Sequence, residues 1–281
     1  ITDKQPMTIA FTKLHGLGND YFFIDAARHK IADPAELSRA MSHRHLGAGA
    51  DGIILVLPGE THPFRMRIFN ADGSEAETCG NGIRCFAKYV YERAMTRETD
   101  FVIETLAGPN RVQLSVDAGK VLAVRSNMGV PKFERAQIPM AGAPGRVMEE
   151  PLALDDGRVV QVTCANIGNP HAVIFVEDAT KVGLTDLGPK IETHPAFPAR
   201  TNVEFVSVLD RENIVMRIWE RGSGITMASG SGSCGSALAS MITDRTERRV
   251  SVHLTFGVLT VTWAEDGCVY QEGPATEVYD G

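Results

Sequence analysis

Cys79 and Ser229 stand in matching sequence contexts that suit acid–base chemistry at a carbon atom. Cys79 is followed by Gly80-Asn81-Gly82 and Ser229 by Gly230-Ser231-Gly232, and each run opens a predicted helix. The unpaired N–H groups and the positive dipole end at a helix N-terminus stabilise a thiolate and bind a carboxylate, and the glycines let a ligand approach the backbone closely. A carboxylate gripped from both helix N-termini would bear the charge that develops when a neighbouring C–H loses its proton.

These two contexts belong to an internal repeat with one fixed offset of 150 residues. Met66-Arg67-Ile68-Phe69 matches Met216-Arg217-Ile218-Trp219, and Gly18-Asn19 matches Gly168-Asn169 in the same register. Single matches of short glycine or apolar strings are common in α/β proteins, but several matches at one offset indicate a duplication. We infer that the chain consists of two tandem copies of one ancestral half.

Each copy is predicted to form short strands, then one helix, then further strands. In the first copy, strand-like text covers 21–24, 53–57 and 64–69, and the helix after Cys79 has one apolar face. We therefore expect an α+β fold in which each copy is a curved, mostly antiparallel, barrel-like sheet around a central helix. The expected domains are 1–130 with Cys79 and 131–281 with Ser229, joined at a Pro- and Gly-rich seam over 129–145. The alternative that the last strand, around 268–281, returns to the N-terminal domain stays open.

Composition narrows the classes of partner. The net charge is −7 and the basic residues form no run, which argues against a nucleic-acid-binding surface. No apolar stretch approaches the roughly 18 residues of a membrane span, and the first six residues lack the apolar run of a signal peptide. The five cysteines are scattered and odd in number, as in a reduced compartment. We expect a cytoplasmic protein whose partner is a small molecule.

Two other motifs fail on their context. The run Gly47-Ala48-Gly49-Ala50-Asp51-Gly52 fits a dinucleotide-binding fingerprint, but it precedes a predicted strand and no helix follows, so NAD binding is rejected. Cys79 and Cys85 do not have the spacing of zinc ligands, and His43 and His45 have no evident companion ligands. No metal site is expected.

Polar residues beside the repeat anchors are candidates for ligand binding. The adjacent charges of Glu220-Arg221 suit an ammonium and a carboxylate on one ligand. With the asparagines near the anchors, the candidate set is Asn19, Asn70, Asn169, Asn202, Glu220 and Arg221.

Taken together, these motifs resemble the diaminopimelate epimerase family over nearly the whole chain. The resemblance rests on runs 13–20, 70–82, 168–171, 200–205 and 219–222. It implies cofactor-independent interconversion of LL- and meso-diaminopimelate by two bases on opposite faces of the α-carbon, Cys79 being one of them. It further implies that Gly80, Asn81, Gly230 and Ser231 hold the reacting carboxylate, that the six candidates bind the rest of the substrate, and that the protein is a homodimer in lysine and cell-wall precursor synthesis.

Ser229 departs from the family pattern, which has a second catalytic cysteine in that place. A serine hydroxyl is a far weaker acid than a thiol, which titrates near pH 8.5, so impaired epimerisation is expected. Three interpretations remain open: an epimerase in which Ser229 works weakly or replaces a native cysteine, a related isomerase or dehydratase that uses a Cys/Ser pair, and an amino-acid-binding homologue without turnover.

Overall fold

The computed structural model describes residues 8–281, which divide into two compact units. The first unit extends to Val124 and includes Pro274–Gly281, and the second is Arg125–Gly273. The division therefore falls a few residues before the sequence-predicted boundary at 130, and the Pro- and Gly-rich segment 129–145 lies inside the second unit. The first six residues, whose polar character predicted the absence of a signal peptide, lie outside the described residues.

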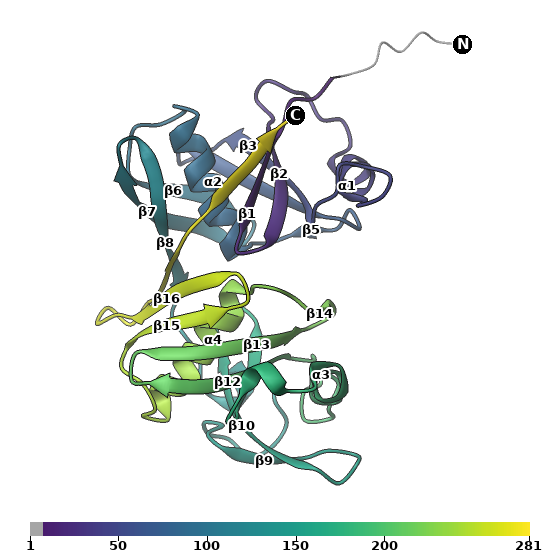
Figure 1. Ribbon diagram of the computed structural model, residues 1–281, viewed down its shortest axis with the longest axis vertical. Helices are drawn as coiled ribbons and strands as arrows, with labels where there is room; N and C mark the ends of the chain where they lie inside the picture. The colour runs from purple at the N-terminus through teal and green to yellow at the C-terminus, as the bar shows by residue number, and fades with distance from the viewer. Residues whose placement is uncertain (1–7) are drawn as a thin grey trace. The chain divides into compact units, whose positions relative to one another are not determined.

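The C-terminal segment joins the first unit because its strand pairs there. β18 (Thr276–Asp280) lies antiparallel to β1 (Thr12–Gly16), with Thr12 opposite Asp280 and His15 opposite Thr276 (Figure 1). The side chain of Arg93 bonds to both Glu277 and Asp280 of this strand. Of the segment 268–281 that the sequence analysis considered for a return to the N-terminal domain, β18 lies in the first unit and β17 (Val269–Gly273) lies in the second.

Besides β1 and β18, the first unit contains β2 (Asn19–Asp25), α1 (Pro34–Ser42), β3 (Gly52–Pro58), β4 (Phe64–Asn70), β5 (Glu75–Ala76), α2 (Gly80–Glu92), β6 (Asp100–Thr105) and β7 (Gly108–Asp117). β8 (Lys120–Gly129) carries the chain into the second unit. The sheet of the first unit has the order β18–β1–β2–β3–β4–β6–β7 and packs against α2. Most pairings are antiparallel, but β2 with β3 and β4 with β6 are parallel.

Besides β17, the second unit contains β9 (Glu150–Ala153), β10 (Val159–Asn166), β11 (Pro170–Phe175), α3 (Leu184–Glu192), β12 (Asn202–Asp210), β13 (Asn213–Glu220), β14 (Gly224–Ile225), α4 (Gly230–Ile242), β15 (Arg249–Leu254) and β16 (Gly257–Trp263), with short 3₁₀ turns at Arg135–Gln137 and Ala179–Lys181. It repeats the plan of the first unit, with the sheet order β9–β10–β11–β12–β13–β15–β16–β17 around α4. Here β11 with β12 and β13 with β15 are the parallel pairings that correspond to those of the first unit.

Helix bounds follow the 150-residue offset seen in the sequence. α2 and α4 each have 13 residues and start 150 apart, and α1 and α3 each have 9 residues at the same offset. The expected α+β fold of two repeated sheet-and-helix units is confirmed. The shorter helix of each unit was not expected, although Asp33-Pro34 carries a start signal: Asp33 caps α1 and Pro34 occupies its first turn.

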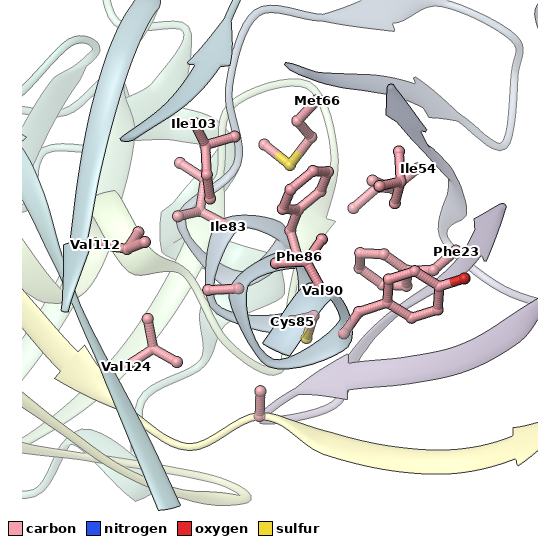
Figure 2. Packing of buried hydrophobic residues seen from close by; sticks show 14 of the residues in the cluster. Phe23, Ile54, Met66, Ile83, Cys85, Phe86, Val90, Ile103, Val112 and Val124 are labelled. Atoms are coloured by element: carbon pink, nitrogen blue, oxygen red, sulfur yellow. The ribbon is translucent and has the colours of Figure 1, made fainter. Parts of the chain in front are cut away.

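The central helix of the first unit is held by its apolar face. Figure 2 shows Ile83, Phe86 and Val90 of α2 packed among side chains from the sheet, including Phe23 and Ile54. These α2 side chains are at most 1% exposed. Burial of a side chain of this size stabilises the fold by about 1.5–3 kcal/mol, so this face fixes the helix and with it the start of the helix at Gly80.

Candidate active site

Cys79 is the N-cap residue of α2. Its backbone is extended (φ −150°, ψ 114°), and its Sγ accepts a hydrogen bond from the Gly82 N–H at 3.4 Å. A side chain at Gly82 would place Cβ 2.9 Å from Ile54 Cδ1, so only glycine lets the first helical turn pack this closely on β3. The expected placement of a thiol at a helix N-terminus is observed.

Two of the predicted binding residues surround this thiol. Asn19, at the start of β2, places Oδ1 3.5 Å from Cys79 Sγ, and the same oxygen accepts from Asn81 Nδ2 at 3.2 Å. Asn19 Nδ2 in turn donates to Asp51 Oδ2 at 2.8 Å. The fold therefore brings Asn19, Cys79 and Asn81 together, with Asp51 orienting the Asn19 amide.

The first turn of α2 rests on a buried arginine that the sequence reasoning missed. Arg84 is fully buried, donating from Nη2 to Asn81 Oδ1 at 2.8 Å and from Nη1 to the Gly80 carbonyl at 3.3 Å. Its Nε donates to the Pro274 carbonyl at 3.2 Å. This guanidinium fixes Gly80 and Asn81 and adds positive charge to a helix end that already favours anions.

Asn70 belongs to a different local network. It ends β4, and its Nδ2 donates to Ser74 Oγ at 3.0 Å in the turn that leads to β5. Its backbone N–H donates to the Ser74 carbonyl at 2.9 Å. The amide of Asn70 is thus held by the turn, half-buried, at the end of the strand that leads toward Cys79.

Ser229 caps α4 in the same way as Cys79 caps α2. Its backbone is extended (φ −130°, ψ 122°), its Oγ accepts from the Gly232 N–H at 3.1 Å, and its side chain is buried. Gly230 is fixed through its carbonyl, which accepts from Gln271 Nε2 at 2.8 Å, while Ser231 is half-buried in the first turn. The second copy therefore preserves the cap geometry with a hydroxyl in place of a thiol.

A buried histidine orients Asn169. His171 and Glu204 are both fully buried, with Nδ1 and Oε1 2.6 Å apart, and His171 Nε2 lies 2.9 Å from Asn169 Oδ1. Burial raises the pKa of Glu204, and the neighbouring His171 partly offsets that rise. Within residues 8–281, Glu204 Oε2 has no hydrogen-bond partner. Neither His171 nor Glu204 was proposed as a site residue from the sequence.

Asn202 holds the backbone of Arg221. Asn202 is 2% exposed, its Oδ1 accepts from the Arg221 N–H at 2.9 Å, and its Nδ2 donates to the Pro170 carbonyl at 2.9 Å. Glu220 Oε2 accepts from Thr226 Oγ1 at 2.8 Å, and the exposed Arg221 side chain donates to the Ala199 carbonyl. The structure thus gathers Asn202, Glu220 and Arg221 at one turn, with Asn202 in a supporting place.

Glu192, another residue that the sequence reasoning missed, closes this turn from α3. Its two carboxylate oxygens accept from Trp219 Nε1 at 2.7 Å and from the Gly222 N–H at 3.0 Å. A side chain at Gly188 would place Cβ 2.4 Å from the Trp219 ring. The fit of α3 against Trp219 and the Glu192 bonds together fix the turn that carries Glu220 and Arg221.

The other thiols are differently placed. Cys85, Cys164 and Cys234 are fully buried, and burial raises the pKa of Cys85 to about 12. No group of three or more His, Cys, Asp or Glu side chains in residues 8–281 is arranged to hold a metal ion. No helix in the same range is long and apolar enough to cross a membrane.

Solved structures of low sequence identity share this fold. The chain matches a Bacillus anthracis phenazine biosynthesis protein of the PhzF family with a TM-score of 0.69 and 17% identity, covering 98% of this chain and 99% of that one. A probable proline racemase from Agrobacterium radiobacter matches with a TM-score of 0.68 and 17% identity, covering 98% and 92%. At these identities the likeness concerns the fold alone.

The chain belongs to the diaminopimelate epimerase family. The sequence model of that family matches residues 11–134 and 163–278. The chain is 51% identical to the diaminopimelate epimerase of Moorella thermoacetica, covering 96% of this chain and 98% of the relative. It is 52% identical to that of Pelotomaculum thermopropionicum, covering 96% and 97%. The family resemblance and the assignment to the isomerases made from the sequence are confirmed.

Proposed function

We propose that this protein interconverts LL- and meso-diaminopimelate by moving a proton at the α-carbon, with Cys79 as one acid–base group and Ser229 in the place of the second. The observation that carries the proposal is an identity of about half with two diaminopimelate epimerases over nearly the full length of each chain. The reaction links lysine synthesis with the synthesis of cell-wall precursors.

Cys79 is the proposed base of the first unit. As a thiolate it accepts the α-proton, so that an S–H bond forms, the C–H bond breaks, and the electron pair is delocalised into the adjacent carboxylate. Backbone N–H groups of Gly80 and Asn81, and those of Gly230 and Ser231, would stabilise that charge. Arg84 supports this role because its guanidinium donates hydrogen bonds to both Gly80 and Asn81 and so fixes their positions.

The remaining predicted residues would bind the rest of the substrate. Glu220 and Arg221 would hold the distal amino-acid group, whose ammonium and carboxylate complement their charges. The asparagines Asn19, Asn70, Asn169 and Asn202 would complete the set, Asn202 acting largely through the Arg221 backbone that it holds. Recognition of the distal group would favour a symmetric diamino acid over a simple one.

Ser229 should limit the rate. Inversion requires a proton from the face opposite Cys79, and a hydroxyl is a poor proton donor compared with a thiol. A well-placed general acid or base contributes roughly 10²–10⁴-fold to a rate. We therefore expect Ser229→Cys to accelerate inversion by a factor in that range.

The test is to incubate LL-diaminopimelate in deuterated water with the Ser229 chain and with Ser229→Cys, following inversion and α-deuterium incorporation. The expected result is fast inversion with label for Ser229→Cys and slow or no inversion for the Ser229 chain. Cys79→Ala in the Ser229→Cys background is the matched control and should be inactive. If Ser229→Cys is inert with diaminopimelate while the Ser229 chain dehydrates or epimerises another amino acid, the proposal is wrong and the protein is a related isomerase or dehydratase. Binding of diaminopimelate without turnover in either form would indicate a binding homologue.

Three further parts of the proposal follow from the family resemblance: catalysis without pyridoxal phosphate or metal, a homodimer, and a cytoplasmic location. Full activity after exhaustive dialysis against a chelator, with no absorbance above 320 nm, is expected of a cofactor-independent enzyme. Sedimentation at twice the chain mass of 30.4 kDa is expected of the dimer.

A further inference from the structure

The phenol of Tyr21 lies against the sulfur of Cys79. Tyr21 comes from β2, two residues after Asn19, and is only 5% exposed in the same core that packs α2. Its Oη lies 3.7 Å from Cys79 Sγ, within hydrogen-bonding distance for sulfur. This hydroxyl has no role in the proton transfer proposed for Cys79.

The groups around Cys79 Sγ differ in which form of the sulfur they favour. The Gly82 N–H at 3.4 Å and the Tyr21 O–H at 3.7 Å are donors, so both favour a negatively charged acceptor. Asn19 Oδ1 at 3.5 Å is an acceptor, so it favours the protonated thiol, which donates to it. The sulfur is therefore placed where it can alternate between thiol and thiolate, and the phenol is a side-chain donor that supports the thiolate.

Tyr21 is also suited to remain a donor. Burial raises its pKa well above the ordinary value for tyrosine, the neighbouring Cys79 and Asp51 raise it further, and a hydrogen bond with Asn19 offsets part of the rise. The phenol therefore keeps its proton across the pH range in which a thiol titrates. It does not compete with Cys79 as a base.

The same register position is polar in both copies of the repeat. His171 of β11 stands 150 residues after Tyr21, and in each strand the next two residues are apolar and fully buried, Phe22 and Phe23 in β2 and Ala172 and Val173 in β11. His171 bonds to Asn169 and Glu204, whereas Tyr21 bonds to Cys79. A hydroxyl in an otherwise apolar run would carry an uncompensated cost of burial without such a partner.

We propose that Tyr21 is a positioning residue that donates its phenolic O–H to Cys79 Sγ and thereby stabilises the thiolate. The inference deepens the proposed function, because the thiolate is the form of Cys79 that removes a proton. It concerns a property of the thiol that can be measured without substrate.

The test is the pH dependence of Cys79 alkylation by iodoacetamide, read from the modified peptide by mass spectrometry in the Ser229 chain and in Tyr21→Phe. Only the thiolate reacts, so the rate follows its population. Loss of one hydrogen bond to a charged group should move the midpoint upward by about one pH unit, with a roughly tenfold slower reaction below both midpoints. Reading the Cys79 peptide alone separates its reaction from that of the partly exposed Cys268.

Tyr89→Phe is the matched control, since it removes a phenolic hydroxyl from the same core without touching the Cys79 sulfur contact. It should leave the alkylation midpoint in place. A merely structural role of Tyr21 would lower thermal stability in Tyr21→Phe and leave the midpoint unchanged, and that outcome would overturn the proposal. Uniform incorporation of 3-fluorotyrosine gives a second reading that does not depend on a folded Phe variant: a more acidic phenol is a better donor, so the midpoint should fall, and an unchanged midpoint contradicts the proposal.

The outcome is independent of the proposed reaction. A shifted midpoint together with an inactive Ser229→Cys would support the role of Tyr21 and refute the epimerase proposal. An unshifted midpoint together with an active Ser229→Cys would do the reverse. Where both hold, Tyr21→Phe in the Ser229→Cys background should move the acidic limb of the kcat/KM profile upward by the same amount as the alkylation midpoint.

Discussion

Glu192 should fix the turn that carries Glu220 and Arg221 and so influence the affinity for substrate. Glu192→Gln tests this expectation. The native carboxylate is 5% exposed and accepts from Trp219 Nε1 at 2.7 Å and from the Gly222 N–H at 3.0 Å. A glutamine keeps one acceptor oxygen, but its NH₂ group would face the second N–H donor. One hydrogen bond to a charged group is lost and one N–H donor loses its partner, which costs about 1.5–3 kcal/mol.

Two measurements check this expectation. Chemical unfolding should show a loss of about 2 kcal/mol in the free energy of unfolding. Steady-state kinetics in the Ser229→Cys background should show a higher KM with kcat less affected, because we propose that the turn holds the distal end of the substrate. Asp186→Asn, on the same helix but in an exposed ion-pair network with Arg158 and Lys190, is the matched control and should cost under about 1 kcal/mol with no change in KM. Unaltered stability and KM in Glu192→Gln would refute the reasoning that the carboxylate fixes this turn.

Two further predictions concern residues of α2. Gly82→Ala would place a methyl group 2.9 Å from Ile54 Cδ1 and 3.6 Å from Cys79 Sγ, so it should destabilise the fold by about 1–3 kcal/mol and slow Cys79 alkylation. Gly183→Ala, whose added group would meet Asp186 Cβ in ordinary van der Waals contact at 3.9 Å, should cost less and leave Cys79 alkylation unchanged. Cys85 should make the protein less stable in alkali: its folded pKa is raised to about 12 by burial, so from about pH 9 upward the unfolded chain loses a proton that the folded chain keeps, and stability falls by about 1.4 kcal/mol per pH unit. Denaturant unfolding at pH 8 and pH 10 should therefore show a larger loss of unfolding free energy in the unsubstituted chain than in Cys85→Ala, and equal losses would contradict this assignment.

The repeat made much of the fold predictable because an element predicted in one copy also predicts its counterpart in the other. The offset of 150 residues gave the starts of α2 and α4 and placed Cys79 and Ser229 at equivalent caps. By contrast, α1 and α3 were not predicted, because they lack the glycine-rich start that marks α2 and α4, although Asp33-Pro34 is a helix-start signal.

The supporting residues of the site were harder to predict. Arg84, Glu192 and Glu204 act through side chains that meet residues far along the chain, and such contacts exist only once the sheet has formed. Tyr21 was missed for a different reason: it opens the apolar run 21–24 of β2, a context that predicts a core residue. Its match to His171 at the repeat offset is the signal that singles it out, since a polar ring at that register in both copies is not explained by packing.

We propose that positions 79 and 229 are equivalent places for the two acid–base groups. A comparison of LL-diaminopimelate inversion by the Ser229 chain, by Ser229→Cys, and by the doubly substituted Cys79→Ser, Ser229→Cys, in which the thiol and hydroxyl exchange places, tests this equivalence. We expect fast inversion only with two thiols, and comparably slow inversion, lower by roughly 10²–10⁴-fold, in both one-thiol forms. A Ser229 chain as fast as Ser229→Cys, or an exchanged form that keeps full activity, would contradict the equivalence of the two positions.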